Sequence, residues 1–197
     1  MKEINLSGKT VFITGVAGFI GSNLALELLK TVPKITIVGL DNMNDYYDVN
    51  IKEWRLKEIE KLASEKSQCS YFCIKGDLAD KETVDKIFAK YEPDIVVNLA
   101  AQAGGRYTIT NPDSYIQSNL IGFFNVLEAC RHYGVEHLVY ASSSSVYGGN
   151  KKVPFSTDDK VDNPVSLYAA TKKSNELMAH AYSKLYNIPS TGLRFFT

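Results

Sequence analysis

The chain has 197 residues, of which 45% are hydrophobic and 22% are charged, and its 22 Lys and Arg residues balance its 22 Asp and Glu residues. This composition is typical of a soluble globular protein and excludes a collagen-like fibre, a disordered tail and a disulfide-stabilised miniprotein. A formal net charge of zero points to neither a nucleic-acid partner nor an anionic membrane partner. The length is enough for one large α/β domain and short for two.

No stretch approaches the roughly 18 apolar residues that span a bilayer, and the first residues lack the apolar core of a signal peptide. The three cysteines, Cys69, Cys73 and Cys130, fit free thiols in a reducing compartment, and their spacing is not that of a metal site. The three histidines are scattered and indicate neither a metal centre nor a Ser/His/Asp triad. We therefore expect a cytoplasmic protein with no membrane partner and no metal.

Apolar runs and helical patterns alternate along the chain. The apolar runs predict strands over residues 9–14, 34–40, 71–75, 94–99, 137–142 and 190–195. The periodicity between them predicts helices over residues 18–30, 51–66, 81–91, 113–133 and 165–187. This alternation predicts an α/β fold, namely a doubly wound parallel sheet with strand order 3-2-1-4-5-6 and helices on both faces. The longest irregular stretch, 147–163, has a length that is typical of functional loops.

Three glycines, Gly15, Gly18 and Gly21, stand between the first predicted strand and the first predicted helix. Glycines at such a junction let the backbone approach a pyrophosphate closely, and the start of the helix adds unpaired N–H groups and a partial positive charge. The spacing is G-x-x-G-x-x-G rather than G-x-G-x-x-G. The strand before and the helix after favour a dinucleotide-binding turn over a turn that is merely tight.

Two aspartates follow the next two strands. Asp41 stands 20 residues after Gly21, where a carboxylate accepts hydrogen bonds from the ribose hydroxyls of adenosine. A carboxylate there repels a 2′-phosphate, and no arginine occurs before Arg55, so the pattern favours NAD over NADP. Asp77 follows the third strand, where it can accept a hydrogen bond from the adenine amino group. The alternative for both residues is a solvated loop aspartate.

Tyr168 and Lys172 stand four residues apart on a predicted helix, so their side chains share one face. Tyrosine has a pKa of about 10, and lowering it to about 7 needs roughly 4 kcal/mol of differential stabilisation. A nearby ammonium and a cationic nicotinamide ring both stabilise the phenolate. The pattern alone is common, but its place after a dinucleotide-binding turn indicates a catalytic base.

Four consecutive serines, 142–145, leave the fifth predicted strand. Ligands of doubly wound sheets lie beyond the carboxyl ends of the strands, so a hydroxyl there can bridge a substrate oxygen and the catalytic tyrosine. We interpret Ser143 in this way. The alternative, a serine that satisfies loop backbone groups, is slightly favoured for Ser144.

Together these motifs resemble the extended short-chain dehydrogenase/reductase family, and within it the nucleotide-sugar epimerase branch. The resemblance covers essentially the whole chain and includes 76–78, 98–101 and 193–197. It implies a Rossmann-like fold, bound NAD and a catalytic set of Ser143, Tyr168 and Lys172. The cofactor contacts that it implies are Gly15, Gly18, Phe19, Ile20, Gly21, Asp41, Asn42, Asp77, Leu78, Leu99, Ala100, Ala101, Asn119, Ser142, Tyr168 and Lys172.

Two stretches, 41–48 and 99–107, are similar to UDP-glucuronate 4-epimerases, with Asn98 where these enzymes usually have His and Gly105 where Val is typical. The resemblance implies a UDP-sugar substrate, a homodimer and a reaction with a transient 4-keto sugar. The Tyr168 phenolate removes the proton of the 4-hydroxyl, and the hydride of C4 passes to NAD⁺ and returns to the other face of the rotated sugar. The implied substrate contacts are Arg106, Ser143, Ser144 and Thr197.

Related enzymes that catalyse other reactions differ from this chain in the serine run, 142–145. The related 4,6-dehydratases carry Asp-Glu just before Val-Tyr-Gly, and UDP-xylose-forming decarboxylases place Glu at the position of Ser145. This chain has Ser144-Ser145, which favours C4 epimerisation. A related decarboxylase or dehydratase, an epimerase of another UDP-sugar and a non-catalytic NAD-binding module stay open. The resemblance also implies that 1–197 is an NAD-binding domain with the catalytic residues, and that a C-terminal substrate-binding domain is largely missing.

Overall fold

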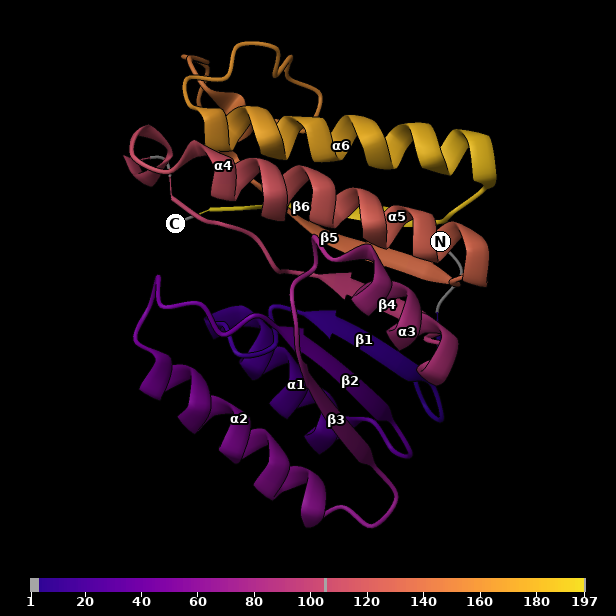
Figure 1. The fold of residues 1–197 in the computed structure, drawn as a ribbon. Coiled ribbons are helices and arrows are strands. Elements are labelled where there is room, and N and C mark those ends of the chain that lie inside the picture. Colours follow the sequence, from indigo (N-terminus) through magenta and orange to yellow (C-terminus); the bar gives the residue numbers. More distant parts are fainter. Residues whose placement is uncertain (1–3, 105, 197) are drawn as a thin grey trace.

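The computed structural model describes residues 4–104 and 106–196, and in this part of the chain it forms one six-stranded parallel sheet (Figure 1). The strand order is β3-β2-β1-β4-β5-β6, which confirms the predicted doubly wound order. Among the described residues no helix is long and apolar enough to cross a membrane.

The predicted elements form close to their expected bounds. The strands are β1 (Thr10–Thr14), β2 (Thr36–Asp41), β3 (Ser70–Lys75), β4 (Ile95–Asn98), β5 (His137–Ser143) and β6 (Ser190–Phe195). The long helices are α1 (Phe19–Thr31), α2 (Val49–Ser64), α3 (Lys81–Tyr91), α5 (Gly122–Tyr133) and α6 (Leu167–Tyr186). The structure adds the short helix α4 (Pro112–Tyr115), the 3-10 turns η1 (Arg106–Ile109) and η3 (Ser144–Tyr147), and the π-helical segment η2 (Ile116–Ile121).

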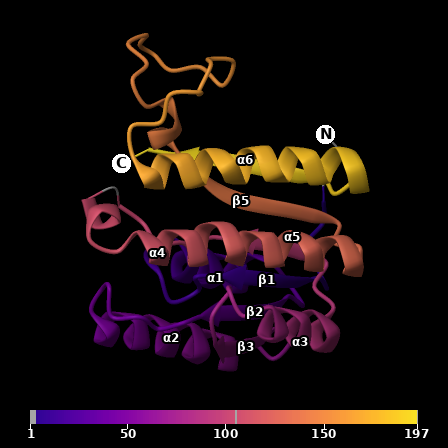
Figure 2. The same ribbon diagram turned by 45° about the horizontal axis from the view of Figure 1, so that its top comes forward.

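Alternating side chains of the central strands enter two separate cores. Phe12 of β1 belongs to a core that it shares with residues of α3, α5 and α6, such as Phe88 and Phe123. Its neighbours Val11 and Ile13 belong to a second core with residues of α1 and α2. Figure 2 shows α5 and α6 side by side over the sheet. Because successive strand residues point to opposite faces, consecutive buried apolar residues such as Val11, Phe12 and Ile13 require helices on both faces.

The helix predicted over 113–133 is interrupted by a π-helical segment. Within η2 the backbone oxygen of Asn119 accepts a hydrogen bond from the side-chain amide of Asn175, at 2.7 Å. A side chain that inserts into the helical hydrogen-bond ladder widens it locally, and such segments are frequent at functional sites. The sequence pattern could not reveal this, because Asn175 comes from α6, more than fifty residues away.

The start of α1 packs directly on the turn that precedes it. A Cβ atom added to Gly21 would lie 2.3 Å from the carbonyl oxygen of Gly15, a backbone atom that the rest of the sheet holds in place. Gly149, by contrast, is exposed and a Cβ there would meet nothing within 4 Å. The two glycines therefore form a matched pair for testing how tightly this junction is packed.

We expect Gly21→Ala to lower the free energy of unfolding by about 1–3 kcal/mol, because the added methyl group must displace backbone. Gly149→Ala, the control, should stay within about 0.5 kcal/mol of the wild type. Urea denaturation followed by circular dichroism measures both. Equal free energies of unfolding for the two variants would mean that the start of α1 can move away from Gly15 without loss of stability, which would contradict tight packing at this junction.

Candidate active site

A cavity of about 130 Å³ lies at the carboxyl ends of β1, β2 and β4. Open parallel sheets bind ligands at this position, where the strand order reverses between β1 and β4. Most of the predicted cofactor contacts line it: Gly15, Gly18, Asp41, Asn42, Asp77, Leu78, Leu99, Ala100 and Ala101. The lining also includes residues to which the sequence analysis assigned no role: Leu40, Asn44, Tyr46, Tyr47, Lys52, Gly76, Gln102 and Ser118.

The glycine turn brings backbone to the edge of this cavity. Gly15 has φ +70°, and a Cβ there would lie 2.9 Å from the backbone nitrogen of Ala100. Gly18 is the N-cap of α1, and no described side chain caps this helix start. Its first N–H groups are therefore available to an anion. Phe19 and Ile20 project from the first turn, with 71% and 44% of their surfaces exposed, and are not part of the cavity lining.

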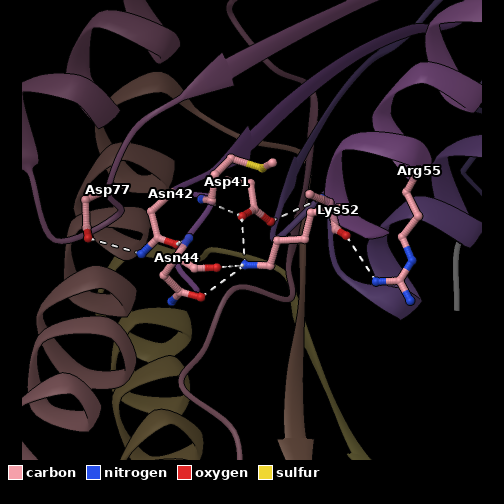
Figure 3. Close-up of polar contacts among 8 residues, drawn as sticks. Asp41, Asn42, Asn44, Lys52, Arg55 and Asp77 are labelled. Carbon is pink, nitrogen blue, oxygen red and sulfur yellow. Dashed lines mark hydrogen bonds and ion pairs between the residues drawn. The ribbon is translucent and has the colours of Figure 1, made fainter. Parts of the chain in front are cut away.

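The Asp41 carboxylate is buried and surrounded by donors (Figure 3). Its Oδ2 accepts the N–H of Ala17 at 3.1 Å, and its Oδ1 accepts the N–H of Met43 at 2.9 Å. The ammonium of Lys52 lies 3.7 Å from Oδ1, and both side chains are only 8% exposed. The same ammonium donates to the backbone oxygen of Asn44 at 2.9 Å and to its Oδ1 at 3.0 Å. Asp41 is thus a paired carboxylate, which sequence spacing alone did not indicate.

The ends of β2 and β3 are joined across the cavity. The Asn42 side chain donates to Oδ2 of Asp77 at 3.3 Å, and Oδ1 of Asp77 accepts the N–H of Ala79 at 2.8 Å. Leu78 packs against Gly122, where an added Cβ would lie 3.2 Å from the Leu78 side chain. The structure therefore places Asn42 and Asp77 as neighbours on the cavity rim, and Leu78 between the rim and α5.

The three predicted catalytic residues lie at the end of β5 and on the first turns of α6. Lys172 is buried, and its ammonium donates to the backbone oxygen of Ala141 at 3.0 Å and lies 5.9 Å from the Tyr168 ring centroid. Ser143 Oγ lies 3.1 Å from Ser145 Oγ and accepts the Ser145 N–H at 3.1 Å. Ser143 also interacts with the Tyr168 phenol, and this interaction lowers the pKa of Tyr168.

Burial disfavours the charged forms of both Tyr168 and Lys172. It raises the pKa of Tyr168, and the hydrogen bond with Ser143 offsets only part of that rise. Burial also lowers the pKa of Lys172 to about 8. In the protein without ligands Tyr168 is therefore a neutral phenol at pH 7, and its conversion to a base needs additional positive charge nearby.

Ser142 and Asn119, which were predicted to contact the cofactor, have partners within the protein. Ser142 Oγ donates to Glu176 at 2.7 Å, and Glu176 also accepts two hydrogen bonds from Arg194. Burial raises the pKa of Glu176, but the hydrogen bonds from Arg194 and Ser142 outweigh it, so the net shift is downward. The Asn119 side chain accepts the N–H of Gln102 at 2.9 Å and donates to its oxygen at 3.1 Å. Neither residue lines the cavity.

The predicted substrate contacts are only partly described. Ser144 begins the turn η3, next to Ser143. Arg106 begins η1, but its side chain lies outside the described part of the structure, and Thr197 lies outside the described residues altogether. Of this group only Ser143 and Ser144 can be located relative to Tyr168.

A chain of tyrosines connects the cavity rim to Tyr168. Tyr46 packs on Tyr107 with ring centroids 5.0 Å apart, and Tyr107 lies 6.3 Å from Tyr115. Tyr115 meets Tyr168 edge to face at 6.2 Å, and its hydroxyl donates to the backbone oxygen of Ala103 at 3.0 Å. Tyr46 and Tyr107, which pack on each other, come from 41–48 and 99–107, the two stretches similar to UDP-glucuronate 4-epimerases. Their place in these two stretches is the signal from which the sequence could have identified them.

Several known proteins are similar to this chain in sequence and structure. Protein CapI of Staphylococcus aureus is 55% identical over 95% of this chain and 53% of its own length. UDP-glucuronate 4-epimerase 4 of Arabidopsis thaliana is 46% identical over 97% of this chain and 42% of its own length. The UDP-glucuronic acid 4-epimerase of Bacillus cereus, solved in complex with UDP-glucuronic acid and NAD, superposes with a TM-score of 0.83 at 31% identity, covering 95% of this chain and 56% of that one.

The chain spans about half the length of the curated relatives it matches. A family profile described as GDP-mannose 4,6 dehydratase matches residues 12–197, which is nearly the whole chain. The match agrees with the motifs, the strand order and the solved neighbours, and it confirms the resemblance noted from the sequence. The chain belongs to this GDP-mannose 4,6 dehydratase family of extended short-chain dehydrogenases/reductases.

Proposed function

We propose that this chain is the NAD-binding, catalytic part of a nucleotide-sugar epimerase that inverts C4 of UDP-glucuronate through a transient 4-keto sugar. The observation that carries the proposal is the meeting of Ser143, Tyr168 and Lys172 at the end of β5, next to a cavity that the glycine turn and Asp41 line. Relatives named UDP-glucuronate 4-epimerases support this choice of substrate.

The residues around the cavity fit an NAD molecule. Gly15 and Gly18 line the cavity without side chains, the start of α1 offers free N–H groups, and Asp41 presents a carboxylate. In this proposal the diphosphate lies at the start of α1, the adenosine ribose at Asp41 and the adenine near Asp77. NAD⁺, when bound, supplies the acceptor and then the donor of the hydride, so the overall reaction has no net redox change.

The chain's own residues move the proton and hold the sugar oxygen. Tyr168 Oη takes the proton of the 4-hydroxyl and later returns it, and the Ser143 hydroxyl donates a hydrogen bond to the same sugar oxygen. The Lys172 ammonium stabilises the phenolate electrostatically. Because burial raises the pKa of Tyr168, the phenolate forms only when a further positive charge is close, so the base becomes active with the cofactor in place.

The serine run favours epimerisation over elimination or decarboxylation. The turn η3, Ser144–Tyr147, has the sequence SSVY and carries no carboxyl group that could expel a hydroxyl as water. A related dehydratase or decarboxylase and an epimerase of another UDP-sugar are the competing functions. A non-catalytic NAD-binding module is a weaker alternative, because a binding role alone needs no buried lysine beside a tyrosine.

We also propose the wider organisation of the enzyme. Since the relatives are about twice as long as this chain, we propose that 1–197 forms the NAD-binding domain and that further sugar contacts, besides Arg106, Ser144 and Thr197, come from a C-terminal part. Exposed apolar side chains on α5 and α6, among them Phe124 and Leu177, support a homodimer formed through these helices. Three free cysteines support a cytoplasmic location.

In the intact enzyme that contains these residues, we expect Tyr168→Phe to lower the turnover of UDP-glucuronate by about 10²–10⁴-fold, because the general base is lost. Tyr186→Phe, at an exposed tyrosine of the same helix, is the control and should leave the rate unchanged. NMR of the products follows both variants. A pentose product, accumulation of NADH or unchanged turnover in Tyr168→Phe would contradict the epimerase mechanism.

The buried Lys172 predicts a specific dependence of stability on pH. Its pKa is about 8 when folded and about 10.4 when unfolded, so the unfolded state binds more protons between these pH values. The buried ammonium therefore costs stability below pH 8, and that cost disappears as the pH rises to about 10.4. Relative to Lys172→Met, the wild type should gain about 1–3 kcal/mol of unfolding free energy from about pH 7.5 to pH 10.

Urea denaturation at several pH values measures this difference. The control is Lys184→Met, at an exposed lysine of the same helix, whose stability relative to the wild type should not vary with pH over this range. A difference between the wild type and Lys172→Met that stays constant with pH would mean that Lys172 has an ordinary pKa.

A further inference from the structure

Lys52 is a buried lysine on a helix whose neighbouring residues are exposed. It lies in the first turn of α2, with 7% of its surface accessible, whereas Ile51 before it and Trp54 after it are 47% and 60% exposed. Lysine is almost never this buried unless its ammonium is paired. Figure 3 shows the side chain reaching from α2 to the end of β2, where Asp41 and Asn44 meet it.

The contacts of Lys52 place a full positive charge in the wall of the cavity. The ammonium lies 3.7 Å from Asp41 Oδ1 and donates to two oxygens of Asn44, and both Lys52 and Asp41 line the cavity. Arg55, one turn further along α2, donates instead to the backbone oxygen of Ala17 at 3.3 Å and is not part of the lining. Lys52 is therefore the cation of α2 that shares the cavity wall with Asp41.

This pairing changes what Asp41 does electrostatically. A lone carboxylate beside the adenosine ribose accepts the ribose hydroxyls and repels a 2′-phosphate, which is how such sites select NAD. With an ammonium 3.7 Å away, the Lys52 charge offsets much of the negative potential that the carboxylate creates around it. The carboxylate keeps its capacity to accept hydrogen bonds but loses much of its power to repel an anion.

We propose that Lys52 is a specificity-determining residue of the cofactor site, which narrows the preference for NAD over NADP by offsetting the charge of Asp41. The inference rests on the proposed NAD-dependent function. It adds the residue that determines how strongly the site discriminates against a phosphate on the adenosine ribose. Lys52 also holds Asn44, but that contact is made to neutral oxygens and favours neither cofactor.

The test compares two cofactors on the same variants. Calorimetric titration of NAD⁺ and NADP⁺ into the wild type, Lys52→Met and the control Lys57→Met gives the ratio of the two dissociation constants for each protein. Lys57 is exposed on the same helix, so its loss removes the same charge away from the cavity. Lys52→Met should raise the ratio of Kd for NADP⁺ to Kd for NAD⁺ by about tenfold or more, because the phosphate then meets an uncompensated carboxylate. Lys57→Met should leave the ratio within about twofold of the wild type, since an exposed charge at this distance is screened.

The outcomes separate selectivity from a structural role. A Lys52→Met variant that weakens both cofactors by the same factor, or that lowers the ratio, overturns the proposal. Should Lys52→Met fail to fold, Lys52→Gln keeps hydrogen-bond donors without the charge, and the same rise in the ratio is expected. Asp41→Asn should lower the ratio, and an unchanged ratio there also overturns the proposal. Failure of the wild type to bind NAD⁺ rejects the proposed function and this inference together, whereas NAD⁺ binding with an unchanged ratio rejects only the inference.

Discussion

The close approach of two strand ends, those of β1 and β4, is the constraint on which the site depends. Thr14, the last residue of β1, is buried, and its hydroxyl accepts the N–H groups of Leu99 at 3.1 Å and Ala100 at 3.0 Å. The same hydroxyl donates to Oδ1 of Asn98 at 2.8 Å. Gly15 must follow immediately, because a side chain there would meet Ala100. This contact fixes the floor of the cavity, and it gives Asn98, where similar enzymes usually have His, a structural partner.

Two helices complete the site from opposite sides of that floor. On one side α2 brings Lys52 to Asp41 and Asn44. On the other side α6 presents Tyr168, Lys172 and Glu176 at intervals of four residues, and therefore on one face. Lys172 donates to the oxygen of Ala141, and Glu176 accepts the hydroxyl of Ser142, so two consecutive residues of β5 hold the helix. This arrangement explains why Ser142, which was predicted to contact the cofactor, is occupied within the protein.

The sheet could be predicted from sequence because its signals are local. Apolar runs, glycine turns and helical periodicity appear within short windows, and all six strands formed close to their predicted bounds in the predicted order. Gly15, Gly18, Asp41 and Asp77 could be assigned to the cavity for the same reason, since each lies at the end of a strand or shortly after it. Lys52 could not, because nothing near it in sequence distinguishes it from the other lysines of α2. Its burial arises because the start of α2 lies near the end of β2, where Lys52 meets Asp41 and Asn44.

The same distinction applies to the chemistry of Tyr168. The spacing of Tyr168 and Lys172 correctly indicated a shared face, but spacing carries no information about burial, which raises the pKa of one group and lowers that of the other. Both shifts favour neutral side chains, so burial opposes the phenolate that the reaction needs, although Lys172 with a pKa of about 8 stays mostly charged at pH 7. Tyr168 therefore stays neutral until a further positive charge, that of the proposed cofactor, lies close to it. Because burial keeps Tyr168 neutral in the absence of this charge, it couples the proposed proton transfer to the presence of the cofactor.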